Sequence, residues 1–272
     1  MEYIIRPVGR LYLGVKELWE YRELFYFFTW RDIKVRYKQT VLGAAWAIVQ
    51  PLLMTLVFTL FFGRTLGIDS GSLPYPLFVF PGMMIWTFFS NGLTNSSGSM
   101  LSSANIIKKI YFPRLIIPIS SILAAMVDLI ISMAILIILL IYYGFTNSLP
   151  SLLLALPFSL ALTLLTLVGS GCFFAALNIK YRDFRYVIPF LLQVLFFMTP
   201  VIYPARLVPI EWVRSVLQLN PVGTAIDLLR QALSGGTPPL DTFLLSFAIA
   251  ITFFLSGIYY FRKTEYYFAD LA

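Results

Sequence analysis

The sequence predicts an all-α integral membrane protein with six transmembrane helices. Of its 272 residues, 59% are hydrophobic and only 12% are charged, which is about half the charged share of a soluble domain. Uncharged runs recur along the chain, and a helix needs roughly 20 apolar residues to cross the hydrocarbon core of a bilayer. Because a soluble fold this apolar could not cover its own surface, the expected solvent is the bilayer.

The spans follow from the uncharged runs and from the turn residues between them. The first lies in the 25 uncharged residues between Lys38 and Arg64. The next run, between Asp69 and Lys108, is too long for one helix, so only its later part is assigned to the second span. The third span is interrupted by one charge, Asp128. The six expected spans are Ala44–Phe62, Pro76–Gly98, Leu115–Tyr143, Leu152–Asn178, Tyr186–Ala205 and Thr242–Phe261.

Basic residues predict the orientation, because cytoplasmic loops of membrane proteins carry an excess of lysine and arginine. Six spans place both termini on one side, and 16 of the 20 basic residues lie on that side. The other four are Arg64, Arg206, Arg214 and Arg230. We therefore expect a multi-pass protein of the cytoplasmic (inner) membrane with both termini in the cytoplasm. The bases flank apolar runs, so the net charge of +7 does not indicate nucleic-acid binding.

Three segments are expected: a cytoplasmic N-terminal segment over residues 1–43, a six-span domain over 44–262 and a cytoplasmic tail over 263–272. Residues Leu11–Thr29 in the first segment have apolar side chains at three- and four-residue steps. This pattern is typical of an amphipathic helix in the membrane interface. Such a helix is equally compatible with a passive surface role and with docking of a partner.

The stretch "RDIKVRYKQTVLGAAWAIVQP" places four bases directly before the first apolar run. They are Arg31, Lys34, Arg36 and Lys38. They fix the direction of the first span, and each is also a candidate for binding anionic lipid headgroups, an attraction worth about 1 kcal/mol near a membrane surface.

Two connections contain more than simple turns. The cytoplasmic one between spans two and three reads "NIIKKIYFPR". It is either a short helix that fits a groove on a soluble partner or a loop that only sets topology. The external segment Arg206–Asp241 predicts two short amphipathic helices, which end before Pro221 and at Gly235–Gly236. They either dip into the outer leaflet, shielded by protein, or lie on its surface.

No pattern of catalytic chemistry occurs in the sequence. It has no Walker A motif, no HExxH, no GxSxG and no histidine at all, which excludes a P-loop and histidine-based metal or proton chemistry. The single cysteine, Cys172, lies in an apolar run and is expected to be inert packing. We therefore predict no catalytic residue, no metal site and no cofactor in this chain.

Asp128 is the one acidic residue inside a predicted span. A carboxylate at this depth is costly and is by default a candidate for function. No lysine or arginine lies at a similar depth in any predicted span. Asp128 is therefore expected to be protonated or bonded to neutral groups such as Ser132 or Asn91, and a structural bond between helices is the favoured interpretation.

Polar and aromatic side chains also gather within the spans. Along the second span, Thr87, Asn91, Thr94, Asn95 and Gly98 form one polar stripe, which suits either a wet pore or a tight helix contact. Aromatic rings in the middle of spans can stack on sugars, although packing or lipid contact is the commoner role for a single ring. These rings belong to Trp46, Phe58, Trp86, Phe89, Phe196 and Phe197.

Four stretches taken together resemble one family. They are "RDIKVRYKQTVLGAAWAIVQP", "NIIKKIYFPRLIIP", "LNIKYRDFRYVIPFLLQVLFFMTPVIYP" and "LNPVGTAIDLLRQAL". In this order around six spans they are similar to the permease subunit of ABC exporters for polysaccharide, of the Wzm type. That class exports O-antigen, capsule or teichoic acid chains. The resemblance extends from about Arg31 to Leu233.

The resemblance implies a homodimer with a channel along its two-fold axis, and a separate dimeric nucleotide-binding ATPase subunit that uses ATP and Mg. The loop Asn105–Arg114 would be the coupling helix in that partner's groove, and Leu11–Thr29 the interface helix beside it. The two short helices in Arg206–Asp241 would form the extracytoplasmic gate. The implied substrate is a polysaccharide on an undecaprenyl diphosphate carrier.

The candidate site residues form three groups. Those expected to contact the nucleotide-binding subunit are Asn105, Ile106, Ile107, Lys108, Lys109, Ile110, Tyr111, Phe112, Pro113 and Arg114. Candidates for the channel lining are Trp46, Phe58, Trp86, Phe89, Asn91, Asn95, Phe196, Phe197 and Tyr203. Candidates for binding headgroups or the carrier diphosphate are Arg31, Lys34, Arg36 and Lys38.

Two other functions are alternatives to the polysaccharide exporter. One is an ABC permease for a small amphiphile or drug. The other is a membrane transferase acting on lipid-linked sugars, which predicts an acidic active-site pair, and none is apparent in the sequence.

Overall fold

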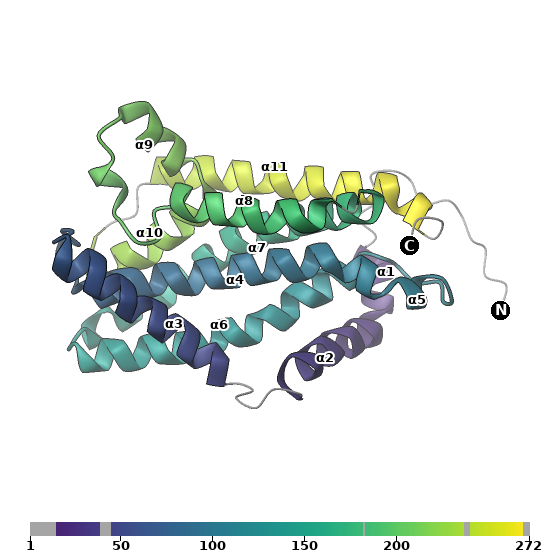
Figure 1. Ribbon diagram of the computed structural model, residues 1–272, viewed down its shortest axis with the longest axis horizontal. Coiled ribbons are helices and arrows are strands. Elements are labelled where there is room, and N and C mark those ends of the chain that lie inside the picture. The colour runs from purple at the N-terminus through teal and green to yellow at the C-terminus, as the bar shows by residue number, and fades with distance from the viewer. Residues whose placement is uncertain (1–14, 39–44, 182, 237–239, 269–272) are drawn as a thin grey trace.

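The structure is a computed structural model that describes residues 15–38, 45–181, 183–236 and 240–268. The described residues are almost entirely helical and include no strand, which confirms the all-α class. Figure 1 labels the α-helices. The elements are α1 (Val15–Glu20), α2 (Arg22–Lys38), α3 (Ala45–Phe58), η1 (Thr59–Thr65), α4 (Tyr75–Ser102), α5 (Ala104–Ile107), α6 (Ile116–Tyr142), η2 (Thr146–Ser148), α7 (Leu149–Lys180), α8 (Phe184–Met198), η3 (Ala205–Leu207), α9 (Glu211–Gln218), α10 (Pro221–Ser234), α11 (Leu240–Thr264) and η4 (Glu265–Tyr267).

Five of these helices are long and apolar enough to cross a membrane by length and composition. They are α3 with η1, α4, α6, α7 with η2, and α11 with η4. A sixth apolar helix, α8, is shorter at 15 residues. These helices follow the order of the predicted spans, and the chain is a multi-pass membrane protein.

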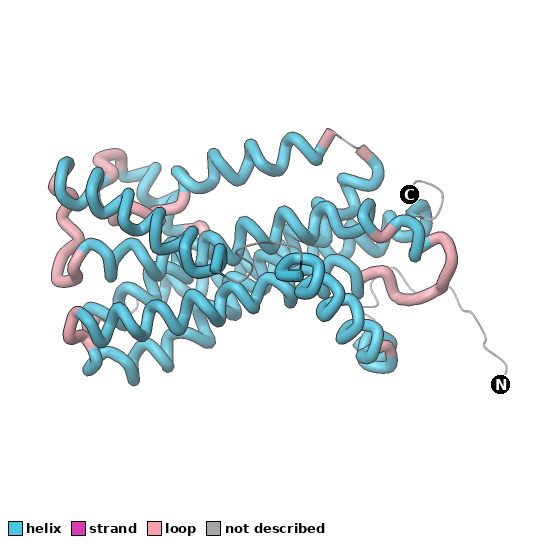
Figure 2. The backbone as a smooth tube through the Cα atoms, turned by 60° about the horizontal axis from the view of Figure 1, so that its bottom comes forward, coloured by secondary structure: helices cyan, strands magenta, loops and turns pink. Residues whose placement is uncertain are grey.

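The helix α4 lies in the middle of the bundle, with α6 and α7 along its sides (Figure 1). Figure 2 shows the described residues from another side, as helices joined by loops. In its most apolar window 78% of the residues are buried, against 11% for α3 with η1. α4 is therefore the central helix, whereas α3 lies against it from outside. The short helices α1 and α5 lie at one end of the bundle, and α9 lies at the other (Figure 1).

Glycine allows α7 and α11 to cross closely. A Cβ built on Gly257 would overlap the backbone of Gly169, and one built on Gly169 would overlap the backbone of Phe253. Small residues at such a crossing are typical of membrane helices, because they let two backbones pack directly against each other.

The fifth predicted span, Tyr186–Ala205, is wrong in its extent. The helix α8 ends at Met198, and Thr199 to Pro204 continue as irregular chain in which Thr199, Val201 and Ile202 are buried. Pro200 and Pro204 cannot continue the helical hydrogen-bond ladder. Fifteen residues at about 1.5 Å each span about 22 Å, which is less than the roughly 30 Å of a hydrocarbon core.

A helix occurs at each of the two positions predicted between spans five and six. The side chain of Asn220 accepts a hydrogen bond from the backbone N–H of Val222 and so caps α10, which begins at Pro221. α10 ends at Gly235, whose φ of 76° suits glycine. Most residues of α10 are buried against α4, α7 and α11, whereas most of α9 is not. The second helix is thus shielded by protein.

The predicted amphipathic helix, Leu11–Thr29, ends earlier than the helix in the structure. Residues 11–14 lie outside the described part, and the chain then forms α1, a turn at Tyr21 and α2. α2 continues past Thr29 to Lys38, with Glu23 in its first turn and Arg36 and Lys38 in its last turn. Charges of these signs favour a helix at its two ends. α2 packs along α6, so its basic end lies beside a membrane-spanning helix.

Candidate functional site

The connection between α4 and α6 contains much less helix than predicted. Only Ala104–Ile107 is helical, and Lys108 to Arg114 form turns and irregular chain. The expectation of a helix over Asn105–Arg114 is therefore wrong in its extent. Pro113 disfavours a helical conformation in the residue before it, which is one local cause.

Burial divides this connection into a base and a tip. The side chains of Ile107 and Phe112 are buried, with 5% and 3% of their surface exposed. At the tip, Ile110 and Tyr111 are 63% and 66% exposed, and two lysines, Lys108 and Lys109, precede them. Ile107 and Phe112, both candidates for contact with a partner, instead pack inside this chain. The tip presents the apolar and basic surface.

The base is anchored to both terminal parts of the described chain. The ring of Phe112 lies 5.6 Å from that of Phe28 in α2, between centroids. The guanidinium of Arg114 donates to the backbone carbonyl of Glu265, and its backbone N–H donates to Glu265 Oε1 over 3.2 Å. The other carboxylate oxygen of Glu265 accepts from Arg262 over 2.8 Å. A force on the tip would therefore reach α2 and α11.

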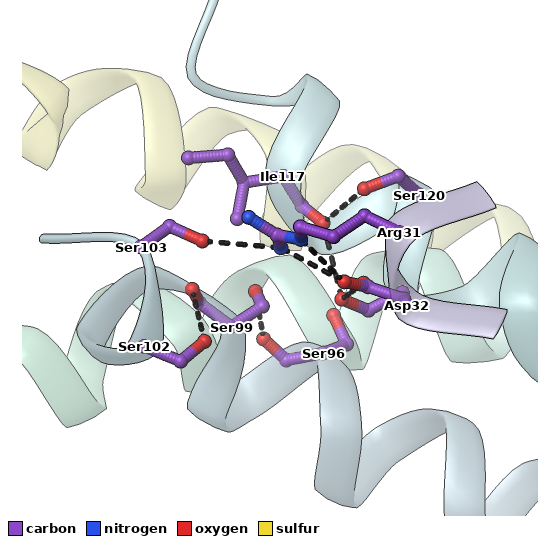
Figure 3. A network of polar contacts seen from close by, with 9 residues as sticks. Arg31, Asp32, Ser96, Ser99, Ser102, Ser103, Ile117 and Ser120 are labelled. Carbon is purple, nitrogen blue, oxygen red and sulfur yellow. Dashed lines mark hydrogen bonds and ion pairs between the residues drawn. The ribbon is translucent and has the colours of Figure 1, made fainter. Parts of the chain in front are cut away.

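A polar network ties α2 to the same region (Figure 3). Arg31 Nη2 lies 2.8 Å from Asp32 Oδ1 and 3.5 Å from the hydroxyl of Ser103, which follows α4. The other oxygen of Asp32 accepts from the hydroxyl of Ser121 in α6 over 2.9 Å. Arg31 also lies over the ring of Phe28. The network holds α2 against α6 and against the start of the connection.

Asp128 has a charged partner, which corrects the prediction made from the sequence. Arg36 Nη1 and the hydroxyl of Tyr37 donate to its two carboxylate oxygens. The sequence predicted no basic residue at this depth, but α2 lies along α6 and brings Arg36 there. Among the described residues Asp128 makes no hydrogen bond to Asn91 or Ser132.

Tyr37 completes this pair as a neutral donor. Burial, and then the hydrogen bond to Asp128, raise the pKa of its hydroxyl to about 12. The hydroxyl therefore stays protonated at neutral pH and donates a hydrogen bond to the carboxylate.

The pair forms one wall of a polar pocket of about 260 Å³ between α2, α3, α4 and α6. Trp46 and Gln50 of α3 and Thr87, Asn91 and Asn95 of α4 line it as well. The amides of Gln50, Asn91 and Asn95 make no hydrogen bond within the described ranges, so their polar atoms are free for a ligand in the pocket.

The opposite face of α4 borders an apolar cavity of about 480 Å³, which lies between α4, α7, α8, α11 and the α9–α10 region. Trp86, Phe89 and Leu93 line it from α4. The Trp86 ring lies 5.5 Å from that of Phe196, and Phe196 lies 6.0 Å from Phe58, between centroids. This cavity and its aromatic cluster are almost free of polar atoms.

The structure thus divides the nine candidates for the channel lining. Trp46, Asn91 and Asn95 meet at the polar pocket, whereas Trp86, Phe89, Phe196 and Phe58 gather at the aromatic cluster. The remaining two lie near the end of α8: Phe197 is 59% exposed, and the Tyr203 hydroxyl donates to its carbonyl over 2.6 Å. Their role in a channel stays a prediction.

The four basic candidates also fall into two groups, those with partners inside the chain and those that are exposed. Arg31 and Arg36 have partners inside the chain, as described above. Lys34 and Lys38 are exposed, and the ammonium of Lys34 lies 5.5 Å from the ring centre of Trp30. The two lysines are the better candidates for an anionic headgroup.

Sequence reasoning missed Arg230, which it grouped with external loop residues. Arg230 is 5% exposed, and its guanidinium donates to the carbonyls of Phe78, Pro200 and Val201. It also lies 3.7 Å from the ring centre of Phe78 and pairs with Asp227. The bonds to Pro200 and Val201 satisfy carbonyls that the break after α8 leaves without helical partners, and the bond to Phe78 joins this segment to α4. The only local signal was the spacing of Asp227 and Arg230 on one helix.

Comparisons with known proteins agree on one family. The model of the ABC-2 type transporter family matches residues 23–234. The chain is 27% identical over 249 residues to the O-antigen export system permease protein RfbA of Klebsiella pneumoniae, covering 92% of this chain and 95% of that protein. It is 30% identical over 218 residues to the protein of the same name from Myxococcus xanthus, covering 76% and 79%. It is 27% identical over 214 residues to the polysialic acid transport protein KpsM of Escherichia coli, also covering 76% and 79%.

Proposed function

This chain belongs to the ABC-2 type transporter family, and we propose that it is the permease subunit of an exporter that carries a lipid-linked polysaccharide across the cytoplasmic membrane. Relatives named as O-antigen export permeases align with nearly its whole length, which supports this substrate class. The chain itself is a non-enzymatic transmembrane subunit.

The observation that carries the proposal is the tip of the α4–α6 connection. Four consecutive residues, Lys108 to Tyr111, present two ammonium groups and two large apolar side chains to the outside. Exposed apolar side chains rimmed by charge mark a protein interaction site. The buried base below them connects this tip to α2 and α11. A separate ATPase subunit docked here would transmit its closure into the spans.

The partners follow from this arrangement. A dimer of the nucleotide-binding subunit binds ATP and Mg, since this sequence has no P-loop. Two copies of the permease form the channel between them. The tip, α1 and α2 lie at the cytoplasmic end, and both termini are on that side, in agreement with the lysine and arginine distribution.

The substrate is a polysaccharide on an undecaprenyl diphosphate carrier. A chain longer than the membrane is thick cannot be enclosed whole, so its sugars pass in sequence along sites that bind weakly and repeatedly. Weak binding at several sites permits both entry and exit, as in conducting channels. O-antigen is the favoured cargo because two of the compared relatives are named for it.

The experiment replaces Ile110 and Tyr111 together by aspartate in the complex with its ATPase subunit. We expect the ATPase subunit to be lost on purification and surface polysaccharide to disappear, with normal amounts of permease in the membrane. Tyr266→Asp is the matched control, because Tyr266 is 81% exposed but lies outside the connection. Normal export by the double variant would contradict the proposal.

The apolar cavity favours a second candidate, a permease for a small amphiphile. Its volume of about 480 Å³ falls within the roughly 300–1,000 Å³ of sites for drug-sized ligands. This function predicts that a fluorescent amphiphile leaves cells that contain the complex faster than cells that lack it. Loss of surface polysaccharide with unchanged amphiphile efflux in a deletion strain would favour the polysaccharide exporter.

A further inference from the structure

We propose that the polar pocket between α2, α3, α4 and α6 binds one uncharged sugar unit of the exported glycan. The amides of Gln50, Asn91 and Asn95 would bond its hydroxyls, and Trp46 would lie against its ring. This inference rests on the proposed function, and it assigns the pocket to the sugars rather than to the diphosphate of the carrier.

The charge of the pocket argues against an anion. Among the described residues that line it, Arg36 and Asp128 are the only charged side chains, and they are paired with each other. An arginine or lysine that is free to pair with a phosphate forms one of the strongest contacts a protein offers to such an anion. Because Arg36 donates to Asp128, the pocket combines a mixed polar and apolar lining with no net charge, which suits a neutral ligand that has both hydroxyl groups and an apolar ring face.

The amides argue against a purely structural role for these polar groups. A buried amide that joins two helices has a partner across the contact, as Asn178 of α7 does when it donates to the carbonyl of Ser97 in α4 over 3.0 Å. Asn91 and Asn95 are half-buried and Gln50 is exposed, and within the parts of the chain that the structure describes none of the three has such a partner. Amide groups turned into a pocket offer both donors and acceptors, as a sugar hydroxyl requires.

Access and size fit a single ring. Trp46 lines the pocket and is 52% exposed overall, so part of its side chain is accessible to a ligand. Aromatic side chains present an apolar body to which the C–H face of a sugar can pack. The volume of about 260 Å³ lies below the roughly 300–1,000 Å³ of sites for drug-sized ligands. One sugar unit fits, and a longer chain would have to continue outside.

The test measures binding directly in the full permease, purified with its ATPase subunit in nanodiscs. The first probe is the oligosaccharide repeating unit released by mild acid from the host's own surface polysaccharide, and the second is inorganic pyrophosphate. Saturation-transfer NMR gives a Kd for each. We expect wild-type protein to bind the oligosaccharide. Asn91→Ala with Asn95→Ala should raise that Kd about tenfold, as expected for the loss of one or two hydrogen bonds.

Two further variants sharpen the result. Trp46→Ala should weaken oligosaccharide binding by a similar factor, and it tests the pocket independently if the double variant does not fold. Thr94→Ala is the matched control, because Thr94 is an exposed member of the same polar stripe on α4 that does not line the pocket. Its Kd should stay within about twofold of wild type. The Kd of pyrophosphate should be the same in all variants.

Three results would overturn the inference. In the first, wild-type protein does not bind the oligosaccharide. In the second, the variants bind the oligosaccharide with wild-type affinity. In the third, the variants lose affinity for pyrophosphate instead of for the oligosaccharide. The surface polysaccharide of a strain that lacks this chain tests the proposed function separately. Unchanged surface polysaccharide in that strain would contradict the exporter function. Loss of the polysaccharide, together with wild-type sugar affinity in the variants, would contradict only the assignment of the pocket.

Discussion

The two faces of α4 border two different cavities. One face places Asn91 and Asn95 beside the paired charges of Arg36 and Asp128, and the other places Trp86 and Phe89 against an apolar space nearly twice as large. The sequence presents both sets on one predicted span. Because a helix turns about 100° per residue, neighbours in the sequence point to different neighbours in space. The amide side chains of α4 thus line one cavity, and its aromatic side chains line the other.

The two sides also differ in how they are held. The irregular chain after α8, which borders the apolar cavity, is held by the buried guanidinium of Arg230. The polar side is held by a pair that is partly exposed, with 26% of the Arg36 and 16% of the Asp128 side chain accessible. We therefore expect the apolar side to be more sensitive to the loss of its arginine.

The largest effect is expected for Arg230→Met. It would leave the buried carbonyls of Pro200 and Val201 without their donor, and each unsatisfied group costs about 1–3 kcal/mol. The free energy of unfolding should fall by several kcal/mol, measured as a lower Tm of the purified protein in detergent. Arg206→Met is the control, because its pair with Asp69 is exposed and worth about 0–1 kcal/mol. Equal Tm values for both variants would disprove the structural role of Arg230.

Trp86→Ala is expected to have the next largest effect. The ring is 7% exposed and packs on Phe89 and Phe196. Truncation of a buried aromatic ring costs about 3–5 kcal/mol in soluble cores, and the loss should be smaller where lipid can enter the space. We expect reduced thermal stability together with slower export. A normal Tm with reduced export would instead indicate that Trp86 contacts the substrate directly.

Removal of the Arg36–Asp128 pair should have an intermediate effect. Arg36→Met and Asp128→Leu should each destabilise the protein by about 1–3 kcal/mol, because each leaves an uncompensated charge in a partly buried place. The double variant should be more stable than the sum of the two losses implies. Additive losses in this double-mutant cycle would show that the two side chains do not interact.

The smallest effect is expected for Tyr37→Phe, which removes one donor to Asp128 and should cost about 1 kcal/mol. Since the pKa of Tyr37 is raised from 10.0 to about 12, the stability it contributes is fully present below about pH 10 and is lost as the pH rises through 12. The difference in Tm between wild type and variant should therefore be constant from pH 6 to 9. A difference that changes within that range would argue against the bond.

Predictions from the sequence succeeded where the cause is local. Uncharged runs located α3, α4, α6, α7 and α11, because a membrane span depends on its own length and composition. Pro221 limited the first of the two short external helices and Gly235 the second, because the end of a helix depends on a few neighbouring residues. Ile107 and Phe112 were assigned to a partner surface, and their burial inside this chain depends on where α2 packs.

The sequence by itself determined the all-α membrane class, the order of the apolar helices and the absence of a P-loop. Tertiary structure alone decided that Arg36 meets Asp128 and that Arg230 satisfies the carbonyls of the broken fifth span. It also decided that the polar and aromatic candidates lie on opposite sides of α4. The reason is physical: a span follows from the hydrophobicity of consecutive residues, whereas an ion pair or a pocket requires residues far apart in the chain to be brought together by helix packing.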